Sequence, residues 1–112
     1  MNYQRIITVT CEEFGISLEE FQSRCRFEHC VIARHIATYL CLECDYRTDK
    51  FKEIGLLTGG RKRATVYHSY KTVNDLMFWR FNGRTIKDYI ESIRRRCSPI
   101  FEYADTIPAN IL

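Results

Sequence analysis

A double glycine followed by three cationic residues has the clearest chemistry in this sequence. Gly59-Gly60 precedes Arg61, Lys62 and Arg63. An arginine can donate two parallel hydrogen bonds to a guanine edge or to a phosphate, and a lysine offers a compact positive charge. The run stands where a helix is predicted to begin, and the amide groups of a helix N-terminus attract anions. These residue types at this position favour contact with a polyanion.

Positive charge is concentrated in one third of the chain. The 112 residues carry a formal net charge of +3. Residues 61–96 hold ten Lys/Arg and three Asp/Glu, a balance of +7, whereas residues 1–60 hold seven and nine, a balance of −2. Residues 97–112 hold two acids and no Lys/Arg. Such a distribution indicates a basic face built for nucleic acid. A solvated cationic surface is the alternative, and the clustering of arginines weighs against it.

Helical patterns surround the cationic run and must position it. Apolar residues recur at spacings of three and four along most of the chain, as in amphipathic helices. Ser17-Leu18-Glu19-Glu20 forms a capping box, Thr85 is a second helix cap, and Thr48 or Asp49 is expected to cap a third helix. The expected helices cover about residues 6–14, 18–24, 29–44, 51–58, 61–80 and 85–97. The predicted fold class is therefore all-α, with six helices.

The two expected helices on either side of Gly59-Gly60 have the lengths and the turn of a helix-turn-helix. In that motif the second helix enters the major groove with its N-terminal residues toward the base edges. Threonine can donate or accept a hydrogen bond there, and small methyl-bearing residues can contact the methyl group of thymine. The residues at these positions are Arg61, Lys62, Arg63, Ala64 and Thr65.

The same segment resembles a known family. Residues 53–68 read E-I-G-L-L-T-G-G-R-K-R-A-T-V-Y-H. They are similar to the C-terminal DNA-binding domain of DnaA, the bacterial replication initiator, whose signature is approximately E-I-G-x-x-F-G-G-R-D-H-[ST]-T-V-x-H. Residues 34–40, R-H-I-A-T-Y-L, resemble the R-Q-[IV]-A-M-Y-L helix of that domain, and Phe14-Gly15-Ile16 resembles its beginning. The resemblance covers about residues 5–76 and implies an all-helical fold akin to the Trp repressor.

The resemblance implies double-stranded DNA as the partner. Groove contacts are expected from Arg61, Lys62, Arg63, Ala64 and Thr65. Contacts to the DNA backbone are expected from Arg34, Lys50, Lys52 and Lys71, and His68 either contacts a phosphate or packs against a neighbouring helix.

The chain departs from the family signature where that signature reads bases. Lys62-Arg63 replaces the Asp-His pair, and Ala64 replaces a Thr/Ser position. A sequence preference different from the initiator's own box is therefore expected, in replication control or transcription regulation. The alternative is a protein-protein interaction module that kept the fold and lost DNA binding.

Several other activities have no support in the sequence. None of the five glycines precedes a lysine, so no G-x-x-x-x-G-K-[ST] loop exists and no nucleotide binding is expected. No nucleophile and base can be paired from spacing, so the chain is expected not to be an enzyme and to need no cofactor. Cys41 and Cys44 lack a second clean ligand pair, because four residues lie between Cys25 and Cys30, so buried thiols are expected rather than a metal.

The chain is expected to be cytoplasmic, without membrane contact. No segment approaches the roughly 18 apolar residues of a membrane span. The N-terminus lacks the pattern of a signal peptide.

Residues 1–97 are predicted to form one domain, with an extra basic helix over 85–97 beyond the family resemblance. The tail, 98–112, is expected to be irregular, and its apolar residues suit packing on the domain or a homodimer with a second copy. The aromatic run 77–81, before an expected Asn82-Gly83 turn, suits a joint between helices or stacking on bases. Arg94-Arg95-Arg96 suits a phosphate clamp or a charged helix end.

Overall fold

The computed structural model describes residues 3–44 and 46–97. The tail over 98–112, and with it the expected homodimer contact, lies outside the described residues. The described part contains six α-helices, one 3-10 helix and a two-stranded hairpin. In chain order the elements are α1 (Tyr3–Phe14), α2 (Leu18–Gln22), α3 (Glu28–Cys44), η1 (Thr48–Lys50), α4 (Phe51–Leu57), α5 (Arg63–Asp75), β1 (Arg80–Phe81), β2 (Arg84–Thr85) and α6 (Ile86–Arg96).

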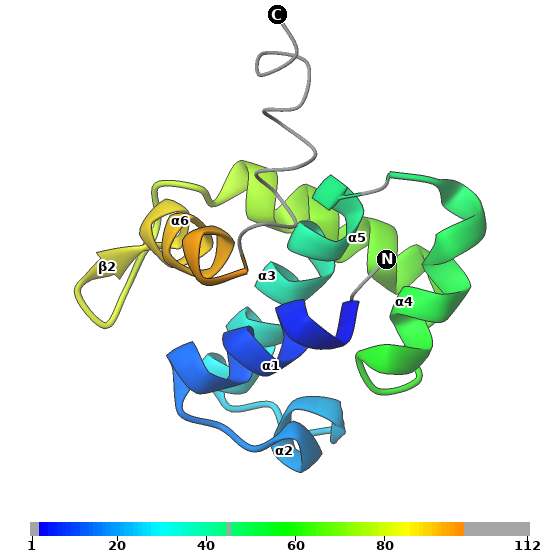
Figure 1. The fold of residues 1–112 in the computed structure, drawn as a ribbon, viewed down its shortest axis with the longest axis horizontal. Coiled ribbons are helices and arrows are strands. Elements are labelled where there is room, and N and C mark those ends of the chain that lie inside the picture. The colour runs from blue at the N-terminus through cyan, green and yellow to red at the C-terminus, as the bar shows by residue number, and fades with distance from the viewer. Residues whose placement is uncertain (1–2, 45, 98–112) are drawn as a thin grey trace, which may run out of the picture.

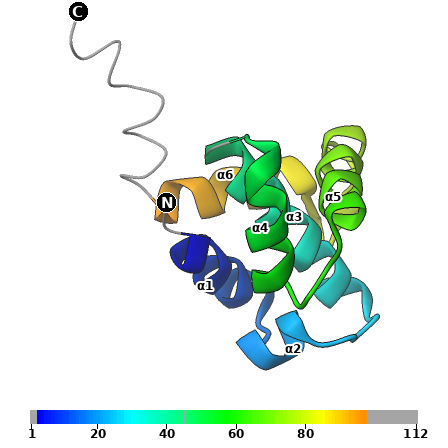
Figure 2. The ribbon, with the colours of Figure 1, turned by 90° about the vertical axis from the view of Figure 1, so that its right-hand side faces the viewer.

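The long helix α3 lies at the centre of the fold, and α1, α2, α5 and α6 pack against it (Figures 1 and 2). Ile36 and Leu40 of α3 are fully buried in a cluster shared with α1, α4, α5 and α6. Cys30 and Ala33 belong to a second cluster, which α3 shares with α1 and α2. A helix that buries several faces in this way organises the whole domain. The all-α fold class predicted from the sequence is confirmed.

Two predicted helix caps are present, and a third is not. The Ser17 hydroxyl accepts from the Glu20 amide at 3.0 Å, and the Glu20 carboxylate accepts from the Ser17 amide at 3.1 Å. Thr85 caps α6 in the same reciprocal manner. The predicted cap of α4 by Thr48 or Asp49 is wrong, because η1 runs directly into α4 without a side-chain cap. The Asp49 carboxylate instead accepts hydrogen bonds from Arg47.

The fifth helix is shorter than predicted, since α5 ends at Asp75 and not near Arg80. The chain then turns into the hairpin, in which Arg80 pairs with Thr85 and Phe81 with Arg84. Both turn residues have positive φ, Asn82 at 52° and Gly83 at 78°, as a tight two-residue hairpin turn requires. The predicted Asn82-Gly83 turn is therefore confirmed, whereas the two short strands beside it were missed. Likewise α2 ends at Gln22, two residues before the predicted end.

The aromatic run before the turn lies partly against the core and partly in solvent. Met77 and Phe81 pack against the main core. Phe78 and Trp79 are 77% and 46% exposed. The joint between α5 and α6 therefore uses Met77 and Phe81, whereas Phe78 and Trp79 face solvent.

Ion pairs hold α6 against α1 and α3. Arg96 pairs with both Glu12 and Glu13 of α1, and Arg94 pairs with Glu43 of α3. Arg84, just before α6, pairs with Glu13 at 3.5 Å and lies over the Tyr89 ring at 4.1 Å. These partners give two arginines of the 94–96 run a role in packing. Within the described ranges, none of the helices has the length and apolarity needed to cross a membrane.

Candidate nucleic-acid interface

The turn between α4 and α5 depends on close backbone contacts. The Arg61 amide donates to the Gly55 carbonyl at 2.8 Å, and the buried Thr58 hydroxyl donates to the Ile54 carbonyl at 2.9 Å. A Cβ atom at Gly55 would lie 2.1 Å from the Arg61 carbonyl oxygen. A Cβ atom at Gly59, where φ is +108°, would lie 2.4 Å from the carbonyl oxygen of Gln22 in α2. The turn is thus fixed against both α4 and α2.

The first residues of α5 are exposed together. Val66, Ser69 and Val73 form the buried face of the helix. Because these positions recur every three or four residues, the opposite side faces solvent along the helix. The predicted groove residues Lys62, Arg63, Ala64 and Thr65 are all exposed. This arrangement presents the N-terminal turn of α5 to solvent.

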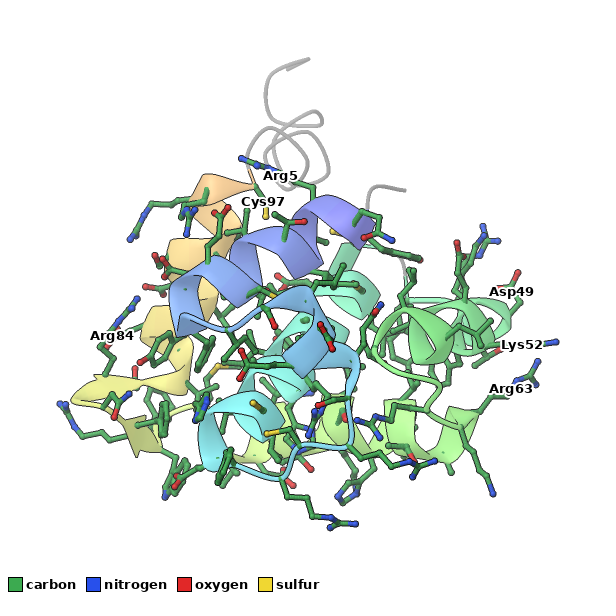
Figure 3. All side chains as sticks on the ribbon, turned by 90° about the horizontal axis from the view of Figure 1, so that it is seen from below. Arg5, Asp49, Lys52, Arg63, Arg84 and Cys97 are labelled. Atoms are coloured by element: carbon green, nitrogen blue, oxygen red, sulfur yellow. The ribbon has the colours of Figure 1, made fainter. Side chains whose placement is uncertain are left out.

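The residues predicted to contact the DNA backbone come from α3, η1, α4 and α5. Lys52 of α4 and Arg63 of α5 project outward on the same side of the molecule (Figure 3). Lys50 lies 3.8 Å from the Glu53 carboxylate. His68 and Lys71 are exposed further along α5, and His68 lies 3.4 Å from the Thr72 hydroxyl of its own helix. The His68 ring is thus exposed and does not pack in the core.

A basic pocket of about 270 Å³ lies beside the start of α5. Arg24 and Arg26 line it from the loop between α2 and α3, Arg34 lines it from α3, and Arg61 from the turn. We call this the arginine pocket. Arg24 and Arg26 were not predicted as site residues, because residues 1–60 have a net charge of −2 and these two cations approach α5 only in the folded chain. The feature that could have identified them is the pair of arginines on either side of Cys25, in a loop.

Arg34 and Arg61 are held in the pocket by the same backbone. Both donate to the Ser23 carbonyl, at 3.1 and 2.8 Å. Arg34 also donates to the carbonyls of Phe21 and Cys25. Burial, followed by the charge of Arg61, lowers the pKa of Arg34. These hydrogen bonds hold the two guanidinium groups at one carbonyl oxygen.

His35 lies at the inner side of the arginine pocket. Its Nδ1 is 2.8 Å from the hydroxyl of Ser69, a buried residue of α5, so the pair joins α3 to α5. Burial is the largest cause that lowers the pKa of His35, followed by the charges of His68 and Arg34. The His35 imidazole therefore stays neutral to a lower pH than the imidazole of a free histidine does, and it lies beside several permanently charged arginines.

The architecture and the arrangement around α5 agree with a comparison to protein families. The sequence profile described as bacterial dnaA protein helix-turn-helix matches residues 3–73. The chain belongs to this family. The match contains α1 to α4 and nearly all of α5, whereas the hairpin and α6 lie after it.

Curated relatives agree with the assignment. Over 84 residues the chain is 33% identical to the chromosomal replication initiator protein DnaA of Geobacter metallireducens, a match that covers 75% of this chain and 18% of that protein. Over 72 residues it is 36% identical to the DnaA protein of Leifsonia xyli, with 64% of this chain and 15% of that protein covered. Over 90 residues it is 31% identical to the DnaA protein of Flavobacterium psychrophilum, with 80% and 18% covered. The chain thus spans less than a fifth of the length of these relatives.

Proposed function

We propose that this chain binds double-stranded DNA by placing the N-terminal turn of α5 in the major groove. The observation that carries the proposal is the exposure of Lys62, Arg63 and Thr65 directly beside the arginine pocket. A helix-turn-helix presents its recognition helix to base edges in this way. The partner is duplex DNA, bound without nucleotide, cofactor or catalysis, in the cytoplasm.

Two groups of residues make different contacts with the DNA. Arg61, Lys62, Arg63, Ala64 and Thr65 approach base edges and the phosphates next to them. Lys50, Lys52, His68 and Lys71 contact the backbone, together with the arginine pocket formed by Arg24, Arg26, Arg34 and Arg61. Contacts to phosphate supply most of the affinity and fix the register, whereas the groove contacts supply the sequence preference.

The preferred DNA sequence differs from the box of the initiator family. Lys62 and Arg63 replace an acidic residue and a histidine of the family signature, and Ala64 removes a hydroxyl. A lysine or arginine donates to the O6 and N7 acceptors of guanine, which an aspartate cannot do. The change therefore favours guanine at the contacted position. The relatives are named as replication initiators, which supports a role in replication control, and transcription regulation is the second role at the same kind of site.

A random-library selection with the purified chain tests the proposal. A library of double-stranded oligonucleotides is enriched through rounds of binding, and the affinity of the selected duplex is compared with that of a scrambled one. We expect an enriched motif that contains guanine. Arg63→Ala should weaken binding to the selected duplex, and Arg95→Ala, which removes an exposed charge from α6, is the matched control. If the chain binds no duplex at low salt, the fold serves as a protein-interaction module instead.

A further inference from the structure

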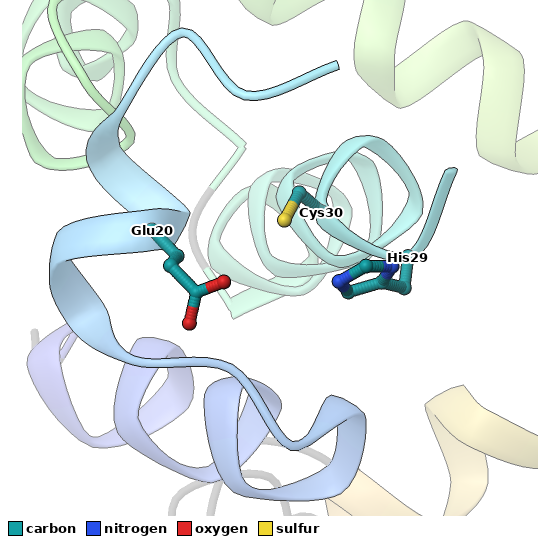
Figure 4. A group of neighbouring side chains, drawn as sticks. All are labelled: Glu20, His29 and Cys30. Atoms are coloured by element: carbon teal, nitrogen blue, oxygen red, sulfur yellow. The ribbon is translucent and has the colours of Figure 1, made fainter. Parts of the chain in front are cut away.

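Three metal-ligating side chains meet between α2 and α3. The carboxylate of Glu20, the imidazole of His29 and the thiol of Cys30 have ligand atoms within 4.8 Å of one another. Figure 4 shows them pointing into one space, Glu20 from α2 and the other two from the start of α3. Among the residues that the structure describes, no other group of three His, Cys, Asp or Glu side chains gathers so closely.

Neighbouring contacts hold each of these ligands in place. Glu20 Oε1 accepts from the Ser17 amide at 3.1 Å, so the capping box orients the carboxylate. The His29 ring stacks on Phe27 with ring centres 5.9 Å apart and an interplanar angle of 7°. Cys30 is fully buried. Supporting contacts of this kind restrict the orientation of a ligand before a metal arrives.

A fourth donor contacts Cys30, outside the group of three whose ligand atoms all lie within 4.8 Å of one another. Cys25 Sγ is 3.2 Å from Cys30 Sγ, and Cys25 belongs to the loop that joins α2 to α3. Two sulfurs, one imidazole nitrogen and one carboxylate oxygen match the number and the types of ligands in a four-coordinate zinc site. Calcium and magnesium prefer sites made of oxygen atoms alone.

We propose that Glu20, Cys25, His29 and Cys30 form a site for a divalent zinc-type ion. Each coordinating thiol gives its proton to water when the ion binds, because the thiolate is the ligand. The proposal departs from the absence of metal expected from the sequence. That expectation considered Cys25 and Cys30 as a bare pair, whereas folding brings Glu20 of another helix next to them.

Such an ion would fix the loop that carries two arginines of the arginine pocket. Arg24 and Arg26 stand on either side of Cys25, and the Cys25 carbonyl accepts a hydrogen bond from Arg34. The ion would join α2, this loop and α3 at one point. The site therefore has a structural function, and its existence does not depend on the proposed DNA binding.

Cobalt substitution of the full chain tests the site. The reduced protein, freed of metal, is titrated with Co²⁺ in the absence of oxygen, and absorption is recorded for thiolate-to-cobalt charge transfer and for the ligand-field bands of tetrahedral cobalt. The affinity for Zn²⁺ is then obtained by displacement of Co²⁺. The variants are Cys25→Ser, His29→Ala and Cys30→Ala, and the controls are Cys44→Ala and His68→Ala, which remove a thiol and an imidazole elsewhere. Circular dichroism verifies that each variant is folded.

We expect one Co²⁺ per chain with both absorption features. Each of the three ligand substitutions should weaken Zn²⁺ binding by about tenfold or more, because even removal of a supporting group commonly costs that much. The two controls should retain the spectrum and the affinity. A wild-type chain without these bands, or a spectrum that is unchanged in His29→Ala or Cys25→Ser, would overturn the assignment. Equal rates of Cys25 and Cys30 alkylation with and without Zn²⁺ would also overturn it.

Discussion

Arg63 is the first residue of α5 and stands exposed where the family signature has a histidine. An arginine paired bidentately with guanine contributes about 1–3 kcal/mol of discrimination against a wrong base. Arg63→Ala should therefore weaken binding to a selected duplex more than binding to a scrambled one. The measurement is the dissociation constant for each duplex at one fixed salt concentration.

Lys71 provides the matched comparison. It lies two turns further along α5, where the helix leaves the groove, so we expect it to contact phosphate only. Lys71→Ala should weaken binding to both duplexes equally and reduce the salt dependence by about one unit of log–log slope. Equal losses for Arg63→Ala on the two duplexes would show that Arg63 contacts phosphate and reads no sequence.

His35 should make the stability of the domain sensitive to mild acid. Its pKa in the fold is lowered from 6.5, with burial as the largest cause. The unfolded chain therefore takes up the proton first, and the free energy of unfolding should fall as the pH drops below about 6.5 toward the folded pKa. His35→Gln removes the titrating group and should flatten this dependence, as measured by urea unfolding at several pH values. An identical pH dependence in the variant would assign the effect to another group.

Among the packed elements, α4 and the turn before α5 can lie in close contact because residue 55 is a glycine. Because its Cβ would meet the Arg61 carbonyl oxygen at 2.1 Å, Gly55→Ala must move backbone in the turn. We expect a loss of about 1–3 kcal/mol in the free energy of unfolding, as for other overpacked sites. Denaturant unfolding followed by circular dichroism provides the measurement.

Gly60 is the control for this substitution. Its φ is +74°, and a Cβ would meet no atom within 4 Å. Gly60→Ala should therefore cost only the left-handed backbone conformation, about 1–2 kcal/mol. It should also leave α5 in place, so that DNA binding by the folded protein is retained. If Gly55→Ala binds DNA as well as Gly60→Ala does, the close contact at Gly55 does not position the recognition helix.

Elements with local signals were predictable from the sequence. Apolar periodicity located all six helices, and the capping boxes at Ser17 and Thr85 gave the starts of α2 and α6. The end of α5 was not predictable from periodicity, because Met77 continues the helical spacing although it already belongs to the turn after the helix. A strand of two residues is too short to show alternation of apolar and polar residues. Only the turn of the hairpin was therefore predictable from the sequence.

The candidate site was predictable in one part only. The order of α4, turn and α5 identified the residues at the start of the recognition helix without further information. The arginine pocket and the group of Glu20, His29 and Cys30 depend on how α2 and its following loop dock against α3 and the turn. Such docking is set by packing between segments distant in the sequence, and a single sequence carries no direct signal for it.

Over the whole molecule, the net charge of +7 in residues 61–96 is larger than the charge that is available to DNA. Arg84, Arg94 and Arg96 already pair with glutamates of α1 and α3. Lys50 also pairs with Glu53, and Arg34 and Arg61 donate to the Ser23 carbonyl. We therefore expect about five phosphate contacts from the remaining backbone-contacting residues, and a slope of log affinity against log salt of about −4 to −5. Dissociation constants measured across a series of salt concentrations give this slope. Arg95→Ala should leave it unchanged, and a slope near zero would contradict an electrostatic DNA face.

The exposed start of α5 and the glycine turn behind it have a consequence for how DNA preference evolves. The turn is fixed by Gly55, Thr58 and Gly59, whereas residues 62–65 are exposed. Substitutions at such exposed positions usually change stability by no more than about 0.5 kcal/mol. A lineage can therefore exchange these side chains, and with them its binding sites in a genome, while the domain continues to fold. A library randomised at the four positions should consist mostly of folded proteins with divergent targets.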